Sequence, residues 1–333
     1  MPKAKRLFQV LINYNREVPM FQLKNLRFLS VFLLCIGILW VCTGGKLAAR
    51  GTAQAGYRLT YKANVGDVFH YEKTREGSRT SERGGQSFES FSDSKFAFHL
   101  QTEKVDSLIT FILTVDTLWS TFESMRGANS IDFGDIKGKR IHAPITQRGE
   151  TREMVPIDSI PEPQMGGRPM RRRFGMQEMG GGRLGWLRVG FFEIPNRQTK
   201  IGDSWTETKR DTLGRENEER ESSRTTITKS KIKYEVLGQE TKMGLTCLHI
   251  KMKTEYTREM SGTMGGSEMS SEGEGETESD VWFAYKEGML VEFTQTDFYE
   301  GTMAFSGMMS GTMPTSSETK TALKLVKWKP GKL

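Results

Sequence analysis

The sequence predicts an all-β protein whose curved antiparallel sheets form open or half barrels, with two related halves and few short helices. Apolar and polar residues alternate in many segments with the period of two that a half-buried strand requires. Turn signals separate these segments at intervals that are typical of hairpins. The chain is also rich in Thr, Ser and Gly, and long helical periodicity is hard to find in it.

The first predicted strand covers residues 57–65, where Tyr57, Leu59 and Tyr61 alternate with polar residues. The same alternation recurs in residues 96–100, 232–236, 248–252 and 289–293. Residues 109–115 are apolar on both faces, which favours a central strand beneath covering elements. Only residues 186–192 have the pattern of a short helix, and two glycines weaken it.

Three clusters of turn residues lie between these runs, at residues 104–107, 238–244 and 286–288. Short connections of this kind join antiparallel strands, whereas parallel strands need a long crossover. We therefore expect consecutive strands to be antiparallel neighbours.

Val65-Gly66-Asp67-Val68-Phe69 is echoed by Ile201-Gly202-Asp203-Ser204-Trp205. In such a turn, Gly adopts a positive φ angle, Asp accepts hydrogen bonds from nearby backbone N–H groups, and the aromatic residue begins an inward-facing strand. The predicted structural turn residues are Gly66, Asp67, Phe69, Gly202, Asp203 and Trp205.

The echo divides the chain into four expected parts: a signal peptide at 1–55, an N-terminal β half at 56–156, a flexible Gly/Met/Arg-rich connector with a short helix at 157–200, and a C-terminal β half at 201–333. Residues 161–185, 259–280 and 301–317 are rich in Gly, Met and polar residues. Such composition buries little apolar surface to offset chain entropy, so we expect loops or mobile hairpin tips.

Residues 24–55 have the pattern of an export signal. Lys24 and Arg27 precede an apolar run at 28–41, and Ala53-Gln54-Ala55 matches an A-x-A cleavage site. The apolar run is shorter than the roughly 17 to 25 residues that span a bilayer as a helix. We expect export by the general secretory route to the periplasm or outer envelope. Translation from Met20, lipidation at Cys42 and retention as an anchor stay open as alternatives.

Cleavage after Ala55 would change the charge of the chain. The first 55 residues hold eight of the 48 Lys and Arg but one of the 41 Asp and Glu, which leaves 40 of each. A neutral mature protein has no general affinity for polyanions, so no nucleic-acid partner is predicted. Cys247 would be the one remaining cysteine, which excludes an intramolecular disulfide.

No catalytic motif, cofactor motif or metal motif is recognisable, so no catalytic residue, metal ligand or cofactor is predicted and the ligand-binding residues are unknown. The four histidines, His70, His99, His142 and His249, show no metal-binding spacing. Cys247 and His249 share one face of a predicted strand, but no orienting acid accompanies them. We interpret both as ordinary strand residues.

Two features of the composition suggest metal binding, but the residues lack the spacing of known metal-binding motifs. Methionines gather in the soft segments, and Met176 and Met179 could bind Cu(I) through their thioethers. Alternating acidic residues at 272–280 could bind calcium loosely. Adaptable apolar contacts and a solvated acidic hairpin are the favoured interpretations.

Residues 57–328 resemble a family of uncharacterised exported bacterial β-rich proteins with only a domain-of-unknown-function label. The resemblance rests on residues 194–205, 234–250 and 282–291. It implies export and a β-rich fold but supplies no catalytic residue. A distant similarity at the level of the fold is to periplasmic lipoprotein carriers, whose curved sheet surrounds acyl chains. The clear lipidation motif of some family members is absent around Cys42.

These features together predict a non-enzymatic envelope protein that binds an apolar or amphiphilic ligand, or another envelope component, in the concavity of a sheet. The expected partners are a lipid or an envelope protein, and membrane contact is expected only through the N-terminal segment if it is uncleaved or lipidated. The alternatives are a structural or assembly protein of the envelope, or an envelope hydrolase.

Overall fold

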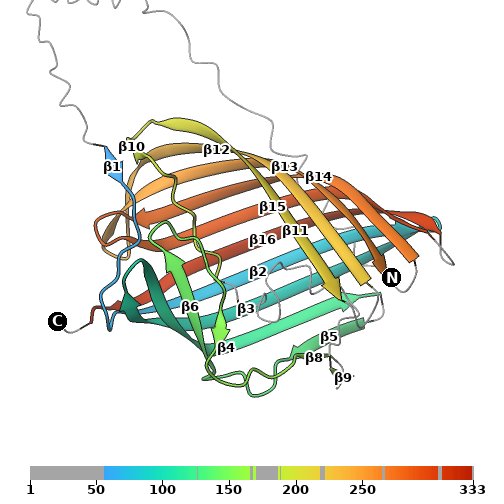
Figure 1. Ribbon diagram of the computed structural model, residues 1–333, viewed down its shortest axis with the longest axis horizontal. Coiled ribbons are helices and arrows are strands. Elements are labelled where there is room, and N and C mark those ends of the chain that lie inside the picture. Colours follow the sequence, from blue (N-terminus) through green and yellow to red (C-terminus); the bar gives the residue numbers. More distant parts are fainter. Residues whose placement is uncertain are drawn as a thin grey trace, which may run out of the picture. The chain divides into compact units, whose positions relative to one another are not determined.

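The computed structural model describes residues 56–333 except 126, 166–167, 170–186, 188, 218–221, 265–266, 307–309 and 332–333. The described residues contain no α-helix and are mostly long antiparallel strands (Figure 1). None of them forms a helix of the length and apolarity needed to cross a membrane. The predicted signal peptide, with Met20, Cys42 and Ala55, lies outside the described residues.

Long strands make up most of one large sheet. They are β2 (Val68–Arg83), β3 (Gln86–Val105), β4 (Leu108–Ser124), β11 (Ser204–Asn217), β12 (Ser222–Lys242), β13 (Leu245–Met264), β14 (Ser267–Ala284), β15 (Met289–Phe305) and β16 (Gly311–Lys329). The short strands are β1 (Tyr57–Arg58), β5 (Gly127–Asp132), β6 (Arg140–Thr146), β7 (Val155–Pro156), β8 (Gln164–Met165), β9 (Arg168–Pro169) and β10 (Gln198–Thr199).

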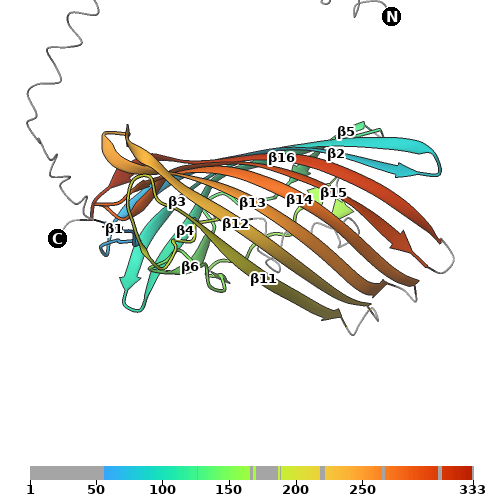
Figure 2. The ribbon, with the colours of Figure 1, turned by 90° about the horizontal axis from the view of Figure 1, so that it is seen from above.

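The sheet is antiparallel throughout and open, in the order β11-β12-β13-β14-β15-β16-β2-β3-β4-β5-β8-β9, with β6 paired to β4 and β7 paired to β6. This confirms the predicted fold class. The segments 56–156 and 201–333 meet edge to edge within the sheet, because the last strand, β16, pairs with β2. The sheet is strongly curved, as Figure 2 shows.

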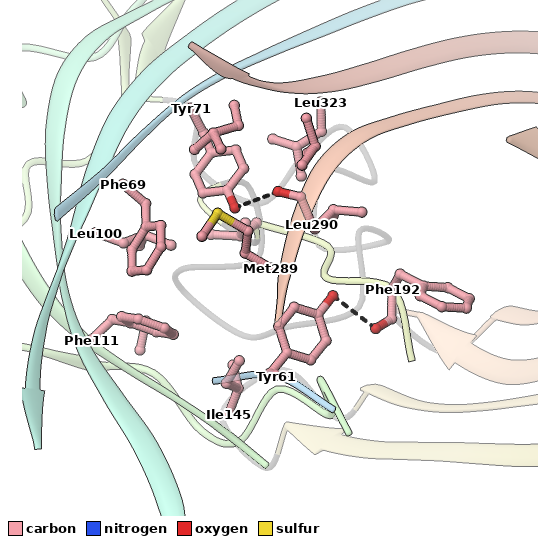
Figure 3. Packing of buried hydrophobic residues seen from close by; sticks show 14 of the residues in the cluster. Tyr61, Phe69, Tyr71, Leu100, Phe111, Ile145, Phe192, Met289, Leu290 and Leu323 are labelled. Atoms are coloured by element: carbon pink, nitrogen blue, oxygen red, sulfur yellow. Dashed lines mark hydrogen bonds between the residues drawn. The ribbon is translucent and has the colours of Figure 1, made fainter. Parts of the chain in front are cut away.

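The hydrophobic core lies at one end of the sheet, near the separate pair of β1 and β10 and near β6, which pairs with β4 (Figure 1). Phe98, Leu113 and Ile250 of the sheet are fully buried there. Figure 3 shows Tyr61 pointing into this core, where its hydroxyl donates to the Phe192 carbonyl oxygen at 3.0 Å. Burial raises the pKa of the Tyr61 phenol well above its ordinary value, so the hydroxyl stays protonated as a donor.

The predicted strand at 57–65 is wrong beyond Arg58, although the burial alternation is real, since Leu59 and Tyr61 are both buried. Tyr61 N donates to the Gln147 oxygen at 2.8 Å, and Lys62 N donates to the Gly288 oxygen at 2.9 Å. The segment therefore bonds to two separate turns instead of one neighbouring strand. An alternation of apolar and polar residues shows that one side of an extended segment is buried, but it does not require that the segment pair with a neighbouring strand.

The two echoed turns have the same local hydrogen bonds. Gly66 and Gly202 have φ angles of 88° and 85°, in the region that a side chain disfavours. Asp67 Oδ2 accepts from Asn64 N at 2.7 Å, and Asp203 Oδ2 accepts from Lys200 N at 2.8 Å. Phe69 is buried and Trp205 packs partly buried against the core. The same short motif therefore forms the turn that precedes β2 and the turn that precedes β11.

The turn at 286–288 is where the sequence predicts it, between β14 and β15, whereas the predicted turn at 104–107 is confined to residues 106–107 because β3 continues to Val105. The predicted turn at 238–244 is wrong in extent, because β12 continues to Lys242. Gly238 follows a register shift in that strand, and Met243 and Gly244 make the reversal, both with positive φ.

Of the loops or mobile hairpin tips expected at 259–280, loops are wrong for the described residues, since these belong to β13 and β14, and the reversal between the two strands lies outside the described residues. Residues 301–305 and 311–317 likewise lie in β15 and β16. Composition misleads here because neighbouring strands supply every strand with backbone hydrogen bonds, so the strands form without burying both faces. Most of the soft segment at 161–185 lies outside the described residues.

A short helix is predicted at 186–192, but residues 189–192 are irregular chain, so the prediction is wrong there. The end of the expected connector instead covers the core. Leu187, Val189, Phe192 and Ile194 are all buried.

We predict that Phe283→Ala lowers the free energy of unfolding by about 3 to 5 kcal/mol, because it leaves a cavity in the core. Phe283 is fully buried, with its ring centroid 5.1 Å from that of Tyr61. The matched control is Phe298→Ala in the next strand, where the side chain is 49% exposed. Urea unfolding of both variants tests this, and an equal loss of stability would contradict the placement of the core.

Candidate functional site

The long strands continue beyond the core as a polar sheet, and their two faces differ in chemistry. We call the side that continues the core the inner face and the opposite side the outer face. On β13, Ile250 is fully buried in the core, and Tyr256 and Arg258 follow on the same side at even spacing. Figure 2 shows these strands running away from the covering segments.

An aromatic platform lies on the inner face at the middle of the sheet. Tyr256 of β13 and Tyr299 of β15 are parallel, with ring centroids 6.3 Å apart and an interplanar angle of 6°. The guanidinium of the exposed Arg258 lies 5.4 Å from each ring centroid. Such a cation over aromatic faces is a weak but directional attraction, and it holds a positive charge at the platform.

Glycines in β14 make room for this platform. The register places Gly275 between Tyr256 and Tyr299, and Gly273 two residues further along. A Cβ atom at Gly275 would lie 2.5 Å from the Tyr256 ring, and one at Gly273 would lie 2.5 Å from the Tyr299 hydroxyl. The rings therefore cover a strand that has no side chain there, and Tyr256 is 8% exposed.

Asp297 fixes the orientation of one ring. Its carboxylate accepts from the Tyr256 hydroxyl at 3.1 Å and from Thr277 Oγ1 at 2.7 Å. Burial, followed by the nearby negative charge of Asp297, raises the pKa of Tyr256, which keeps this hydroxyl a donor. Burial lowers the pKa of Arg75, and the nearby negative charge of Asp297 opposes this effect by favouring the charged guanidinium.

The two faces carry opposite charge. Basic residues predominate on the inner face: Lys73, Arg75, Arg79, Arg83, Lys209, Arg224 and Arg258, against Glu207, Asp211 and Asp297. Acidic residues predominate on the outer face of β13 to β16: Glu255, Glu259, Glu268, Glu272, Glu274, Glu276, Glu278, Asp280, Glu292, Glu300 and Glu318, against Lys251, Lys253, Lys320, Lys324, Lys327 and Lys329. The two faces of the sheet therefore differ in charge.

Apolar side chains accompany the basic ones on the inner face. Met303 lies directly opposite Met313 across β15 and β16, and Met260 and Met269 lie on the same face nearby. Met260 is 7% exposed. Flexible thioether side chains adapt to irregular apolar partners, which suits a binding surface as well as packing. Met176 and Met179, the candidate copper ligands, lie outside the described residues.

An open hollow of about 800 Å³ lies over β12 to β16 and β2. Most of its lining residues lie on the outer face, among them Glu82, Lys229, Glu259, Glu272, Glu274 and Glu300, whereas Arg258, Gly273, Gly301 and Thr315 lie on the inner face. The hollow does not mark the inner face, so the candidate site is a broad, open face of the sheet.

His249 does not face Cys247, the partner weighed from the sequence. Its Nδ1 lies 2.8 Å from Glu240 Oε1 and its Nε2 lies 2.8 Å from Asp280 Oδ1, while its ring stacks on Trp282 at 4.5 Å. Cys247 is fully buried, and burial raises the pKa of its thiol to about 11. A buried neutral thiol is a poor nucleophile, so this pair offers no covalent chemistry.

A charged network continues from His249 along the outer face. Trp282 Nε1 donates to Glu240 Oε2 at 2.8 Å, and Lys242 Nζ lies 4.1 Å from the Trp282 ring centroid. Lys242 and Lys324 reach Glu292 at 2.9 and 3.0 Å. Burial by itself would raise the pKa of Glu292, but hydrogen bonds from the two lysines outweigh it and lower the pKa.

The acidic run at 272–280 lies along a single strand, β14, with its carboxylates projecting to the outer face. Glu272, Glu274, Glu276 and Glu278 are exposed. Carboxylates that follow one another on an extended strand do not converge, so this arrangement supplies no calcium cage.

The platform was not predicted from the sequence. The alternation of Gly and Glu at 273–276 was the available signal, since a Gly at every second position leaves one side of a strand bare. Tyr256 and Tyr299 belong to two strands separated along the chain by β14, and only the register of the strands shows that they flank the same glycine.

Comparison with known proteins identifies no family for this chain. No family model matches it. No curated protein is detectably similar to it in sequence. Among solved structures, an outer membrane channel from Pseudomonas putida F1 is 7% identical, with 83% of this chain and 98% of that chain covered and a TM-score of 0.29.

Two other structural neighbours are as distant. Neisserial surface protein A is 7% identical over 78% of this chain and 99% of that chain, with a TM-score of 0.20. An exported protein with a YmcC-like fold from Bacteroides fragilis is 10% identical over 83% of this chain and 100% of that chain, with a TM-score of 0.18. These TM-scores are too low to establish a common fold or activity.

We predict that Gly275→Ala destabilises the protein by about 1 to 3 kcal/mol, because the new methyl group would overlap the Tyr256 ring and the backbone of β15. Gly214→Ala is the matched control in edge strand β11, where a Cβ atom meets nothing within 4 Å. Thermal unfolding compares the two variants. A neutral Gly275→Ala substitution would mean that the ring does not cover this glycine.

We also predict a change in acid stability for Glu292→Gln. Because the folded-state pKa of Glu292 is lowered, its stabilisation is present above the ordinary carboxyl pKa and is lost as pH falls through the folded-state value. The variant should be about 1 to 3 kcal/mol less stable near neutral pH, since the two lysines lose a charged acceptor.

Urea unfolding between about pH 7 and pH 3 measures this difference, which should shrink as the pH falls. Glu276→Gln is the control, because the Glu276 side chain is 58% exposed in its pair with Lys253. A pH-independent difference between Glu292→Gln and the wild type would contradict the assignment.

Proposed function

We propose that the protein is an exported, non-enzymatic envelope protein that binds an anionic amphiphile on the inner face of its sheet. Export follows from the predicted signal at 1–55. The observation that carries the binding proposal is the platform of Tyr256 and Tyr299 beneath the Arg258 guanidinium. It combines a flat apolar surface with a fixed positive charge.

The head group of the ligand is chosen by charge. A phosphate or carboxylate accepts paired hydrogen bonds from a guanidinium, and Arg258 and Arg79 are both exposed on this face. Arg79 Nε donates to Thr315 Oγ1 at 3.1 Å. A guanidinium has five N–H donors, so this hydrogen bond uses one of them. The acidic outer face would repel the same head group, so the charge difference selects the inner face.

The apolar part of the ligand is matched by the residues beyond the platform. Met260, Met303 and Met313 follow Arg258 toward the ends of the strands on the same face. A hydrocarbon chain laid along this row contacts thioethers and a tyrosine ring while its head group stays at the arginines. An acyl chain supplies about 0.8 kcal/mol for each buried methylene.

The test uses lauroyl lysophosphatidylglycerol below its critical micelle concentration, with lauroyl lysophosphatidylcholine as the zwitterionic counterpart. Calorimetric titration of the purified protein should detect binding of the anionic lipid and weaker binding of the zwitterionic one. Arg258→Gln should weaken anionic binding by about tenfold, the equivalent of one charge-assisted hydrogen bond.

The matched control is Lys253→Gln, which removes one positive charge from the outer face of the same strand. It should leave the affinity unchanged. Equal effects of the two substitutions would refute the inner face as the site, and no binding of either lipid would refute the ligand class. A chain that binds no lipid but forms stable protein crosslinks in intact cells would be the assembly component considered from the sequence.

A further inference from the structure

Two histidines and an aspartate meet on the outer face of β2, β3 and β4, away from the amphiphile platform. His70 lies directly opposite His99 in the register of β2 and β3, and their ring centroids are 5.2 Å apart. His99 Nδ1 lies 2.9 Å from Asp116 Oδ1. Their neighbours Phe69, Tyr71 and Phe98 are buried on the inner side, which directs these polar side chains outward.

A β-bulge brings Asp116 to the cluster. Ala97 of β3 pairs with Thr117, and Phe98 pairs with Val115, so Asp116 is an extra residue on β4. Bulges commonly re-aim a side chain, and here the extra residue turns its carboxylate toward His99. A regular pairing would leave β4 one residue shorter at this point, without this carboxylate beside the imidazole.

The donor atoms suit a metal ion. One ligand atom from each of His70, His99 and Asp116 can be chosen so that all lie within 4.8 Å of one another. Bonds of about 2.0 to 2.2 Å to a tetrahedral Zn²⁺ place neighbouring donors roughly 3.3 Å apart. Small side-chain rotations would close the difference, because all three residues are only half-buried.

We propose that His70, His99 and Asp116 form a Zn²⁺ site with an open fourth position for water. Two imidazoles and one carboxylate match the borderline softness of this ion. The ion would link three adjacent strands at the end of the sheet that contains the core. The site is independent of the amphiphile proposal, and it differs from the absence of metal ligands that the sequence predicts.

Two lysines set the expected strength of the site. Lys327 lies opposite His70 in β16, and the charges of Lys327 and Lys329 act on His70. Positive charges nearby oppose a dication, so we expect a dissociation constant on the order of micromolar and not the much tighter binding of closed structural zinc sites.

The test is titration of the metal-free full chain with ZnCl₂ by calorimetry, followed by Co²⁺ substitution and visible absorption. The wild type should bind one Zn²⁺, and His99→Gln and His70→Gln should each bind it at least tenfold more weakly. His142→Gln is the matched control, since His142 is also half-exposed and its Nδ1 lies 3.2 Å from Glu103. It should bind as the wild type does.

Circular dichroism and thermal unfolding without metal show whether each variant is folded, and the two histidine variants provide independent tests. Co²⁺ bound by the wild type should give the intense visible bands of a low-coordinate site, and these should be lost in His99→Gln. Unchanged Zn²⁺ affinity in both folded histidine variants, an equal loss in His142→Gln, or no Zn²⁺ binding by the wild type would overturn the proposal.

Discussion

Continuous strands that begin in the core and extend into the polar sheet are the constraint on which the rest of the structure depends. β13, for example, contributes fully buried Leu248 and Ile250 at one end and exposed Arg258 further along. Burial at the first end offsets the chain entropy of ordering the sheet. Beyond the core, backbone hydrogen bonds between neighbouring strands keep the sheet regular, although the side chains there bury little apolar surface.

The hydrophobic core that holds these strands is built from separate parts of the chain. Leu59 and Tyr61 come from the start of the described chain, Phe192 and Ile194 come from its middle, and all are buried against the curved sheet. Pairing of β16 with β2 joins the two ends of the chain into one surface. Charge, aromatic rings and glycines are then distributed over one curved sheet, and this gives the inner face its binding character.

Much of the fold follows from local sequence. The Gly-Asp turns specify where β2 and β11 begin, because positive φ and a carboxylate acceptor are properties of those residues themselves. Regular alternation likewise identifies the strands near the core. Prediction fails at residues 59–65, whose alternating burial comes from crossing the core, and at residues 259–280, whose polar composition conceals regular strands.

The sequence by itself therefore determined the fold class and the repeated strand entry, and it predicts an export signal, since each depends on residues close together along the chain. Only the tertiary structure decided which residues meet across strands. Tyr256 and Tyr299 share a platform because the register sets both beside Gly275. His99 meets Asp116 because a bulge shifts β4 by one residue. Register fixes such meetings, since a slip of one residue would turn each side chain to the opposite face.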